Sequence, residues 1–233
     1  MNILITAGGT QERIDQVRSI TNTSTGKTAH SIAEFLYENS YKNIYYVHAD
    51  KAESFANAKE NIAFVSSDDL ERALKDILRD THIDVIIHLA AVSDFIVDKV
   101  VINGELFEAS NISKISSKDE VELVLKKRSK IIDHLKTFAL KSTPLVIGFK
   151  LTNSKEYEDQ IEQVLALSMN ESVDFVVHND LNDIDSNTHK TQIFFRDSLV
   201  FTGETKEHLS KNLLELIKTY TFNLQNFTSY LSN

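Results

Sequence analysis

A short apolar strand that ends in paired glycines constrains the fold of this chain more than any other feature. Ile3-Leu4-Ile5 runs into Gly8-Gly9. Parallel α/β proteins use a buried strand that opens into a glycine turn to bring backbone N–H groups close to a phosphate. The N-terminus therefore predicts the first strand of a parallel sheet, with an anion site at its carboxyl end.

The glycines match neither of the two common phosphate-binding motifs. Gly8-Gly9 lacks the third glycine of the dinucleotide fingerprint G-x-G-x-x-G, and no helix follows at once. Gly26-Lys27 looks like the end of a P-loop, but the first glycine of that motif is replaced by Thr21. We interpret the segment as two successive loops that hold a nucleotide together.

Apolar runs of strand length alternate with amphipathic helical stretches along the rest of the chain. We predict strands at residues 2–6, 43–48, 63–65, 85–89, 145–149 and 175–178, and a late hairpin at 192–195 and 199–201. We predict helices at residues 27–38, 68–80, 129–140, 156–169 and 206–219, with Ser67 as the cap of the second. This alternation predicts a Rossmann-like, doubly wound α/β fold whose mostly parallel sheet carries helices on both faces.

A polar region interrupts this alternation. We predict a turn-linked strand pair within residues 100–107 and another strand at 121–125, joined by a segment without a helical face. We interpret residues 95–127 as a β flap or dimerisation insertion in a single domain that spans residues 1–233. The aromatic side chains of the tail, residues 221–233, are expected to pack onto the body.

Composition excludes several classes of function. The chain has 233 residues, a net charge of −9 and no cysteine. It therefore has no disulfide framework and no cysteine nucleophile, and nonspecific binding to nucleic acid is not expected. No apolar run approaches the roughly 20 residues that span a bilayer, so we expect a cytoplasmic protein without membrane contact. The eight histidines form no metal-ligand motif, and we assign no metal-binding residue.

The first loop and several later segments resemble one enzyme family. Residues 5–27 read I-T-A-G-G-T-x-E-x-I-D-x-V-R-x-I-T-N-x-S-x-G-K, which resembles phosphopantothenate–cysteine ligase (phosphopantothenoylcysteine synthetase) of coenzyme A biosynthesis. Further similar segments are A-A-V-S-D-F at 90–95, K-I-S-S at 114–117, G-F-K at 148–150 and N-D at 179–180. The chain begins at the ligase motif, so it resembles the stand-alone form, and a separate decarboxylase is expected for the next step.

The resemblance implies a ligase that activates a carboxylate with a nucleoside triphosphate. The carboxylate of 4′-phosphopantothenate attacks the α-phosphate, releases pyrophosphate and forms an acyl-nucleotide. The amine of L-cysteine then displaces the nucleoside monophosphate to give 4′-phosphopantothenoylcysteine. The resemblance also implies CTP as the nucleotide, with ATP as an alternative, Mg²⁺ as its companion and a homodimer.

The matched positions imply the site residues. Asn22 would donate to the acyl carbonyl, Arg18 would orient the site or bind substrate anions, and Asp94 would accept from the exocyclic amine of cytosine. The full sets are Asn22, Lys114 and Arg18 for catalysis, and Gly8, Gly9, Thr10, Ser24, Thr25, Gly26, Ala91, Asp94, Phe149 and Asn179 for the nucleotide. His88 ends a predicted strand, and we interpret it as a hydrogen-bonded strand-end histidine without a catalytic role.

Lys114 matches the lysine that reaches the triphosphate from a flap in the resembling family, in some members from the neighbouring subunit. Lys118 is the nearest substitute. Because residues 107–118 are poor in buried-type side chains, we expect the segment to be mobile without ligand and to close over the triphosphate.

Two other classes of protein stay open. One is a Rossmann-type NAD(P)-dependent oxidoreductase, which the incomplete glycine fingerprint disfavours. The absence of lysine four residues after any tyrosine disfavours it as well. The other is a nucleotide-binding protein without catalytic activity.

Overall fold

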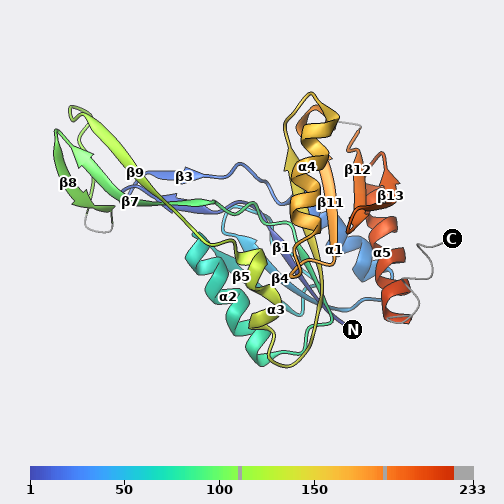
Figure 1. The fold of residues 1–233 in the computed structure, drawn as a ribbon. Helices are drawn as coiled ribbons and strands as arrows, with labels where there is room; N and C mark the ends of the chain where they lie inside the picture. Colours follow the sequence, from blue (N-terminus) through green and yellow to red (C-terminus); the bar gives the residue numbers. More distant parts are fainter. Residues whose placement is uncertain (110–111, 186–187, 223–233) are drawn as a thin grey trace.

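An eight-stranded sheet with helices on both faces forms the body of the protein (Figure 1). The computed structural model describes residues 1–109, 112–185 and 188–222. The strand order is β13-β12-β11-β10-β6-β1-β4-β5. The strands are β1 (Asn2–Ala7), β4 (Asn43–Ala49), β5 (Glu60–Phe64), β6 (Val85–His88), β10 (Leu145–Thr152), β11 (Phe175–Asp180), β12 (Thr191–Phe195) and β13 (Ser198–Gly203).

The six strands from β5 to β11 are parallel, and β12 and β13 continue the sheet in antiparallel pairs. Their order places β1 beside β6, so the chain winds outward in opposite directions from this pair. This is the strand order of a Rossmann fold, and its switch point lies between β1 and β6. The predicted fold class is therefore confirmed.

Two apolar layers hold helices against the sheet, because the side chains of a buried strand alternate between its faces. Ile3 and Ile5 of β1 pack with α1 (Lys27–Glu38) and α5 (Lys206–Phe222). On the other face, Leu4 packs with α2 (Ser67–Asp80), α3 (Leu135–Phe138) and α4 (Tyr157–Ser168). Two short 3-10 helices complete the described elements, η2 (Ile131–His134) and η3 (Leu181–Asp183).

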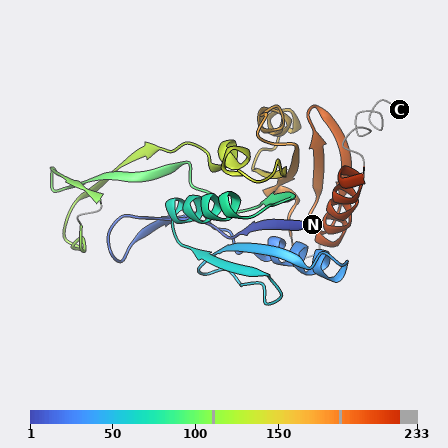
Figure 2. The same cartoon turned by 90° about the horizontal axis from the view of Figure 1, so that it is seen from below.

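Three strands project from the body as an arm (Figures 1 and 2). We define the arm as β7 (Phe95–Ile102), β8 (Glu105–Glu108) and β9 (Val121–Lys127), a separate antiparallel sheet in which β7 is central. Every residue of β8 and β9 is exposed, in contrast to the buried strands of the body. A hairpin of β2 (Gln11–Arg13) and β3 (Ser19–Thr21) extends beside the arm.

Several boundaries differ from the predictions. The cap of α2 is Ser66, not Ser67: its side chain accepts from the Asp69 N–H, and Asp69 bonds back to the Ser66 N–H. The predicted helix at 129–140 is not one continuous α-helix. The 3-10 helix η2 occupies its first part, and the four-residue helix α3 follows. The β2–β3 hairpin was not predicted. The side chains of the tail, residues 221–233, lie outside the described part.

Candidate functional site

A cavity of about 650 Å³ lies at the carboxyl edge of the sheet, at its switch point. Residues at or just beyond the ends of β1, β6, β10 and β11 contribute to its wall, as do the residues that lead into α1. Ligands of open α/β sheets bind in this crevice. Nine of the predicted residues line it: Gly8, Asn22, Ser24, Thr25, Gly26, Ala91, Asp94, Phe149 and Asn179.

The N-terminus of α1 faces the cavity without a cap. Its N-cap is Gly26, which has φ +74° and no side chain to accept from the first turn, and that turn holds no acidic residue. By contrast, α2 has both the Ser66–Asp69 capping box and acidic residues in its first turn. The first amides of a helix carry partial positive charge and need an acceptor. The uncapped end of α1 is therefore suited to an anion.

Gly9 lets the chain that carries Asn22 approach the sheet. A Cβ atom at Gly9 would lie 1.9 Å from the backbone oxygen of Asn22, so any other residue would push this loop away. The Asn22 N–H donates to the Thr10 oxygen at 3.1 Å, which fixes the backbone. Within the described residues the side-chain amide of Asn22 has no protein partner. It lines the cavity and can bond to a ligand.

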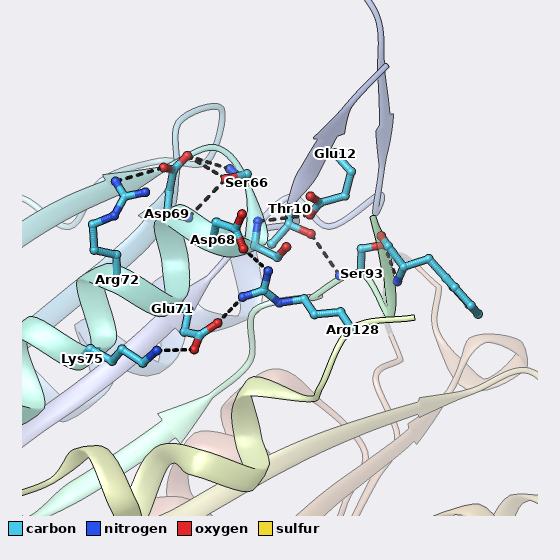
Figure 3. A network of polar contacts seen from close by, with 12 residues as sticks. Thr10, Glu12, Ser66, Asp68, Asp69, Glu71, Arg72, Lys75, Ser93 and Arg128 are labelled. Atoms are coloured by element: carbon cyan, nitrogen blue, oxygen red, sulfur yellow. Dashed lines mark hydrogen bonds and ion pairs between the residues drawn. The ribbon is translucent and has the colours of Figure 1, made fainter. Parts of the chain in front are cut away.

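Thr10 supports the site from behind. Its side chain is fully buried, its N–H donates to the Ala91 oxygen at 3.1 Å, and its Oγ1 accepts from the Ser93 N–H at 3.0 Å (Figure 3). The Ala91 N–H in turn donates to the Gly8 oxygen at 2.9 Å. Thr10 and Gly9 do not line the cavity. We therefore no longer assign a direct phosphate contact to the Thr10 amide.

The cavity is cationic although the chain is acidic. Four lysines line it, and Asp94 is the one carboxylate among the described lining residues. Lys150 is half-buried, and burial together with the nearby charge of Lys130 lowers its pKa, while Asp94 acts in the opposite direction. The lysines are Lys27, Lys130, Lys150 and Lys206. This excess of positive charge favours a ligand with several negative charges.

An apolar wall forms another part of the cavity. Ile132 from η2 and Leu167 from α4 form this wall on one face of the sheet, whereas Phe149 of β10 packs on the opposite face. A Cβ atom at Gly148 would lie 2.7 Å from Ile132, so glycine at this position allows the wall to approach the sheet. A flat ring could pack against this wall or against Phe149.

Arg18 lies outside the cavity and joins two loops. Its guanidinium donates to Asp15 at 2.7 Å and to the Ile115 oxygen at 3.0 Å. Burial of Asp15 would raise its pKa. However, N–H donors from Ile115, Val17 and Arg18 and the charge of Arg18 outweigh this effect and lower the pKa to about 2. This contact pattern is that of a structural ion pair, with no contact to the cavity.

Lys114 also lies outside the cavity of its own chain. It is exposed between two anchored neighbours: the Gln16 N–H donates to the Ser113 oxygen at 3.2 Å, and the Ile115 N–H donates to Asp15 at 3.1 Å. Ile115 is buried. These contacts tie residues 113–115 to the β2–β3 hairpin, and mobility of segment 107–118 without ligand stays a prediction.

Arg128 fixes the base of the arm. It follows β9 and forms ion pairs with Asp68 and Glu71 of α2, and Glu71 also binds Lys75 at 2.6 Å (Figure 3). Nearby, the buried Glu12 accepts from the Ser67 N–H at 3.1 Å. These contacts join the arm and the β2–β3 hairpin to the body.

Sequence reasoning missed several lining residues. Lys150 could have been found, since it ends a predicted strand at the carboxyl edge. Lys130, Lys206 and His189 gave no local signal, because the fold brings them to the cavity from η2, α5 and the loop before β12. His88 lines the cavity as well, and its Nδ1 lies 3.0 Å from Thr6 Oγ1.

The described part of the chain contains neither a candidate metal centre nor a membrane-spanning helix. Within 1–109, 112–185 and 188–222, no three histidine, aspartate or glutamate side chains gather in a way that could hold a metal ion. In the same ranges, no helix is long and apolar enough to cross a membrane.

The fold and the cavity define a doubly wound α/β protein with an anion-suited crevice at its switch point. Comparison with known families is more specific: residues 1–220 match the DNA/pantothenate metabolism flavoprotein C-terminal domain, and the chain belongs to this family. This agrees with the resemblance drawn from the motifs.

Individual relatives support this assignment. The chain is 27% identical over 219 residues to the coenzyme A biosynthesis bifunctional protein CoaBC of Methanocaldococcus jannaschii, and 29% over 218 residues to that of Thermococcus kodakarensis. Both alignments cover 93% of this chain and 50% of the relative, so the chain spans about half the length of these proteins. The DNA/pantothenate metabolism flavoprotein of Streptococcus pneumoniae has a similar structure, with TM-score 0.81 and 32% identity over 94% of this chain and 99% of that one.

Proposed function

We propose that this protein is a phosphopantothenate–cysteine ligase that uses CTP. The observation that carries the proposal is the cavity at the switch point, where four lysines and an uncapped helix N-terminus gather in a chain of net charge −9. Two of the three expected substrates, the nucleoside triphosphate and 4′-phosphopantothenate, are strongly anionic. Relatives named as coenzyme A biosynthesis proteins support the same assignment.

The triphosphate binds at the N-terminus of α1 in this proposal. Ser24, Thr25 and the first amides of α1 would donate to phosphate oxygens, while Lys27 offsets their charge. Gly8, with φ +85°, lies beside this loop, and a Cβ atom there would lie 2.6 Å from the Ala49 side chain. The turn therefore excludes side chains where the phosphates approach.

Asn22 would stabilise the carbonyl oxygen of the acyl-nucleotide. Its side-chain amide is free of protein partners within the described residues, and its backbone is held by Thr10. An amide donates to an oxygen that gains negative charge, without forming an ion pair with the substrate carboxylate beforehand. No protein nucleophile is needed, because the nucleotide itself activates the carboxylate.

Asp94 and the apolar wall would select the base. The exposed carboxylate of Asp94 lines the cavity and can accept from an exocyclic amine. Uracil presents an acceptor oxygen at the corresponding position, so this contact would favour CTP over UTP. Adenine also carries an amine, and ATP remains the second candidate nucleotide.

The arm would complete the cavity of a second copy. Lys114 is exposed on a pinned segment beside the arm, away from its own cavity. Apolar residues on one face of the arm, Phe107, Leu123 and Leu125, are about 36–46% exposed. A homodimer that buries these side chains could bring Lys114 to the triphosphate of the partner subunit.

Mg²⁺ would enter with the triphosphate. The described residues offer a cavity with one carboxylate, which suits an ion held mainly by phosphate oxygens and water. The ion would reduce the charge on the phosphates while the carboxylate attacks.

An assay of pyrophosphate release tests the proposal. We expect release that requires both CTP and 4′-phosphopantothenate, and L-cysteine should then be required for release of CMP. Pyrophosphate release without 4′-phosphopantothenate, or none with any nucleotide, would contradict it.

A thermal-shift series separates the alternatives and tests Asp94. CTP should stabilise the protein more than UTP, and more than NADH or NADPH. Stabilisation by a nicotinamide nucleotide alone would favour the oxidoreductase. Binding of CTP without turnover would favour a non-catalytic protein, and equal shifts with CTP and UTP would remove Asp94 from base selection.

A further inference from the structure

His88 is a buried donor in the cavity that the proposed reaction does not use. It is the last residue of β6, is 6% exposed and lines the cavity near the switch point. Polar groups buried to this extent are normally hydrogen-bonded through all their polar atoms. Its two ring nitrogens have different surroundings, and the difference indicates a role.

The hydrogen bond between His88 and Thr6 determines which ring nitrogen of His88 carries the proton. Thr6 Oγ1 accepts from the Ala90 N–H at 3.0 Å and lies 3.0 Å from His88 Nδ1. Within the described residues the hydroxyl has no other acceptor, so it donates its hydrogen to Nδ1. Nδ1 is then the unprotonated nitrogen, and the proton of the neutral ring lies on Nε2. Burial lowers the pKa of His88 to about 4, so the ring is neutral near pH 7.

Nε2 is left as a donor without a protein acceptor. No described residue accepts from it, although His88 lines the cavity. A fixed N–H donor in a buried wall loses free energy unless a ligand or water accepts from it.

The neighbours of His88 indicate which part of a ligand it meets. In the register of β6 and β10, His88 pairs with Gly148, so both residues direct their Cα substituents to the same face of the sheet. On that face a Cβ atom of Gly148 would contact Ile132 and Leu167, which belong to the apolar wall. Lys150 lies two residues beyond Gly148 on the same face, and the charges of Lys130 and Asp94 act on it. The donor of His88 therefore lies beside apolar surface on a face that also carries charged groups. A flat heterocycle can place its ring against the apolar wall and an acceptor atom against this donor.

We propose that His88 is a specificity-determining residue whose Nε2–H donates to an acceptor atom on the base of the bound nucleotide. The proposal rests on the proposed function only in taking a nucleotide as the ligand. Asp94 would accept from the base and His88 would donate to it, so the two side chains together would recognise a base that carries both a donor and an acceptor.

Two substitutions of His88 test the donor separately from the fold. In His88→Asn, the shorter amide can keep a partner for Thr6 near the position of Nδ1 but cannot reach the position of Nε2. In His88→Gln, the longer amide can place an N–H near Nε2. His48 provides a matched control: it is buried near the end of β4, which is separated from β6 by β1, bonds to the Ala49 oxygen and does not line the cavity.

Binding is measured by calorimetry with CTP and with ribose 5-triphosphate, which lacks a base. We expect His88→Asn to weaken CTP about fivefold to tenfold, in keeping with one neutral hydrogen bond. Ribose 5-triphosphate should bind as it does to the unchanged protein. His88→Gln should recover most of the CTP affinity, and His48→Asn should change neither ligand. In the unchanged protein, the ¹⁵N resonance of Nε2 should shift on addition of CTP but not of ribose 5-triphosphate.

Two outcomes would overturn the proposal. Equal weakening of CTP and ribose 5-triphosphate would place His88 against the ribose or the phosphates, and unchanged CTP affinity in His88→Asn would leave it a structural residue. The readout is binding rather than ligation. A protein that binds CTP through His88 but forms no product would contradict the proposed function alone.

Discussion

The body and the arm of this protein are both built on β-sheets, but they obtain their stability differently. In the body, Ile3 to Ala7 of β1 are fully buried between two layers of helices. In the arm, β8 and β9 are exposed along their whole length (Figure 2). An isolated sheet of few strands is marginally stable in water unless an apolar face is covered. The sheet of the body is therefore covered by helices of its own chain, whereas the arm keeps exposed surface that a second copy would cover in the proposed homodimer.

The anchoring contacts of the arm support this division. Arg128 holds its base to α2, and Asp15 and Arg18 hold the segment around Ile115. The first contact ties the arm to the body, and the second ties the segment around Ile115 to the β2–β3 hairpin. Substitutions in each region should therefore separate chemistry in the body from assembly through the arm.

The largest effect should come from Asn22→Asp, which changes the body alone. A carboxylate repels the charge that develops on the acyl carbonyl, and losing one such donor costs ~10²–10³ in rate, about 2.7–4 kcal/mol. Thermal stability and CTP binding should persist, because the Asn22 side chain has no protein partner within the described ranges. Steady-state formation of 4′-phosphopantothenoylcysteine measures the loss. Near-normal turnover would reduce Asn22 to a loop residue.

Lys114→Gln should have the next largest effect, although the substitution lies far from its own cavity. We expect formation of the acyl-nucleotide to fall by roughly 10²-fold, in the range of losing one charge-stabilising group, with thermal stability nearly unchanged since Lys114 is exposed. Single-turnover pyrophosphate release measures the step. Lys126→Gln is the matched control, because it removes the same charge from an exposed position of the arm.

Mixing Lys114→Gln with Asn22→Asp tests whether the arm acts on a partner. A mixed dimer would contain one cavity with an intact Asn22 and an intact Lys114 from the other chain, so part of the activity should return. No recovery after verified subunit exchange would show that both residues serve the same chain.

Much of the body and the strands of the arm could be predicted from the sequence, whereas the β2–β3 hairpin could not. The buried strands carry nearly continuous apolar runs, and helices such as 27–38 have a clear apolar face, so local pattern and final environment agree. The β2–β3 hairpin has no comparable pattern, because its residues are stabilised by contacts distant in sequence, such as Arg18 with Ile115. Lys130 and Lys206 likewise reach the cavity only through the tertiary arrangement.

A smaller effect, on association, is expected from Leu123→Asp. Leu123 pairs with Val100, which pairs with Phe107, so these three side chains form one apolar row on the same face of the arm. Val100 is already buried within the chain, whereas Leu123 and Phe107 are 36% and 39% exposed and are the two that a partner would cover. A charge in this row should make the free energy of dimerisation less favourable by at least about 2 kcal/mol, which raises the Kd of the dimer roughly 30-fold. Light scattering across a dilution series measures the shift to monomer, while CTP binding to the body should persist.

Val124→Asp is the matched control for Leu123→Asp. Val124 is adjacent and also exposed, but successive residues of a strand point to opposite faces, and it pairs with Lys99 on the other one. If both variants dissociate equally, the apolar row is not the interface. If neither does, the arm is not the site of assembly.

The smallest effect should come from Asp15→Asn. It should be confined to the local stability of the segment around Ile115, whose N–H donates to Asp15. Asp15 has a pKa near 2 in the folded protein against 3.8 ordinarily, so its carboxylate contributes stability that is fully present above about pH 4. That contribution is lost as the pH falls from the pKa of Asp15 in the unfolded chain to its pKa in the folded protein. In this range the unfolded chain binds a proton at Asp15 and the folded protein does not. Protection of the Ile115 amide against hydrogen exchange, corrected for the intrinsic rate, should therefore decrease from pH 4.5 to pH 3. In Asp15→Asn it should be several-fold lower at pH 4.5 and should vary less with pH, while the amides of β1 change little. Equal Ile115 protection in both proteins would mean that the arm is held by its strands and by Arg128, without the help of the Asp15 carboxylate.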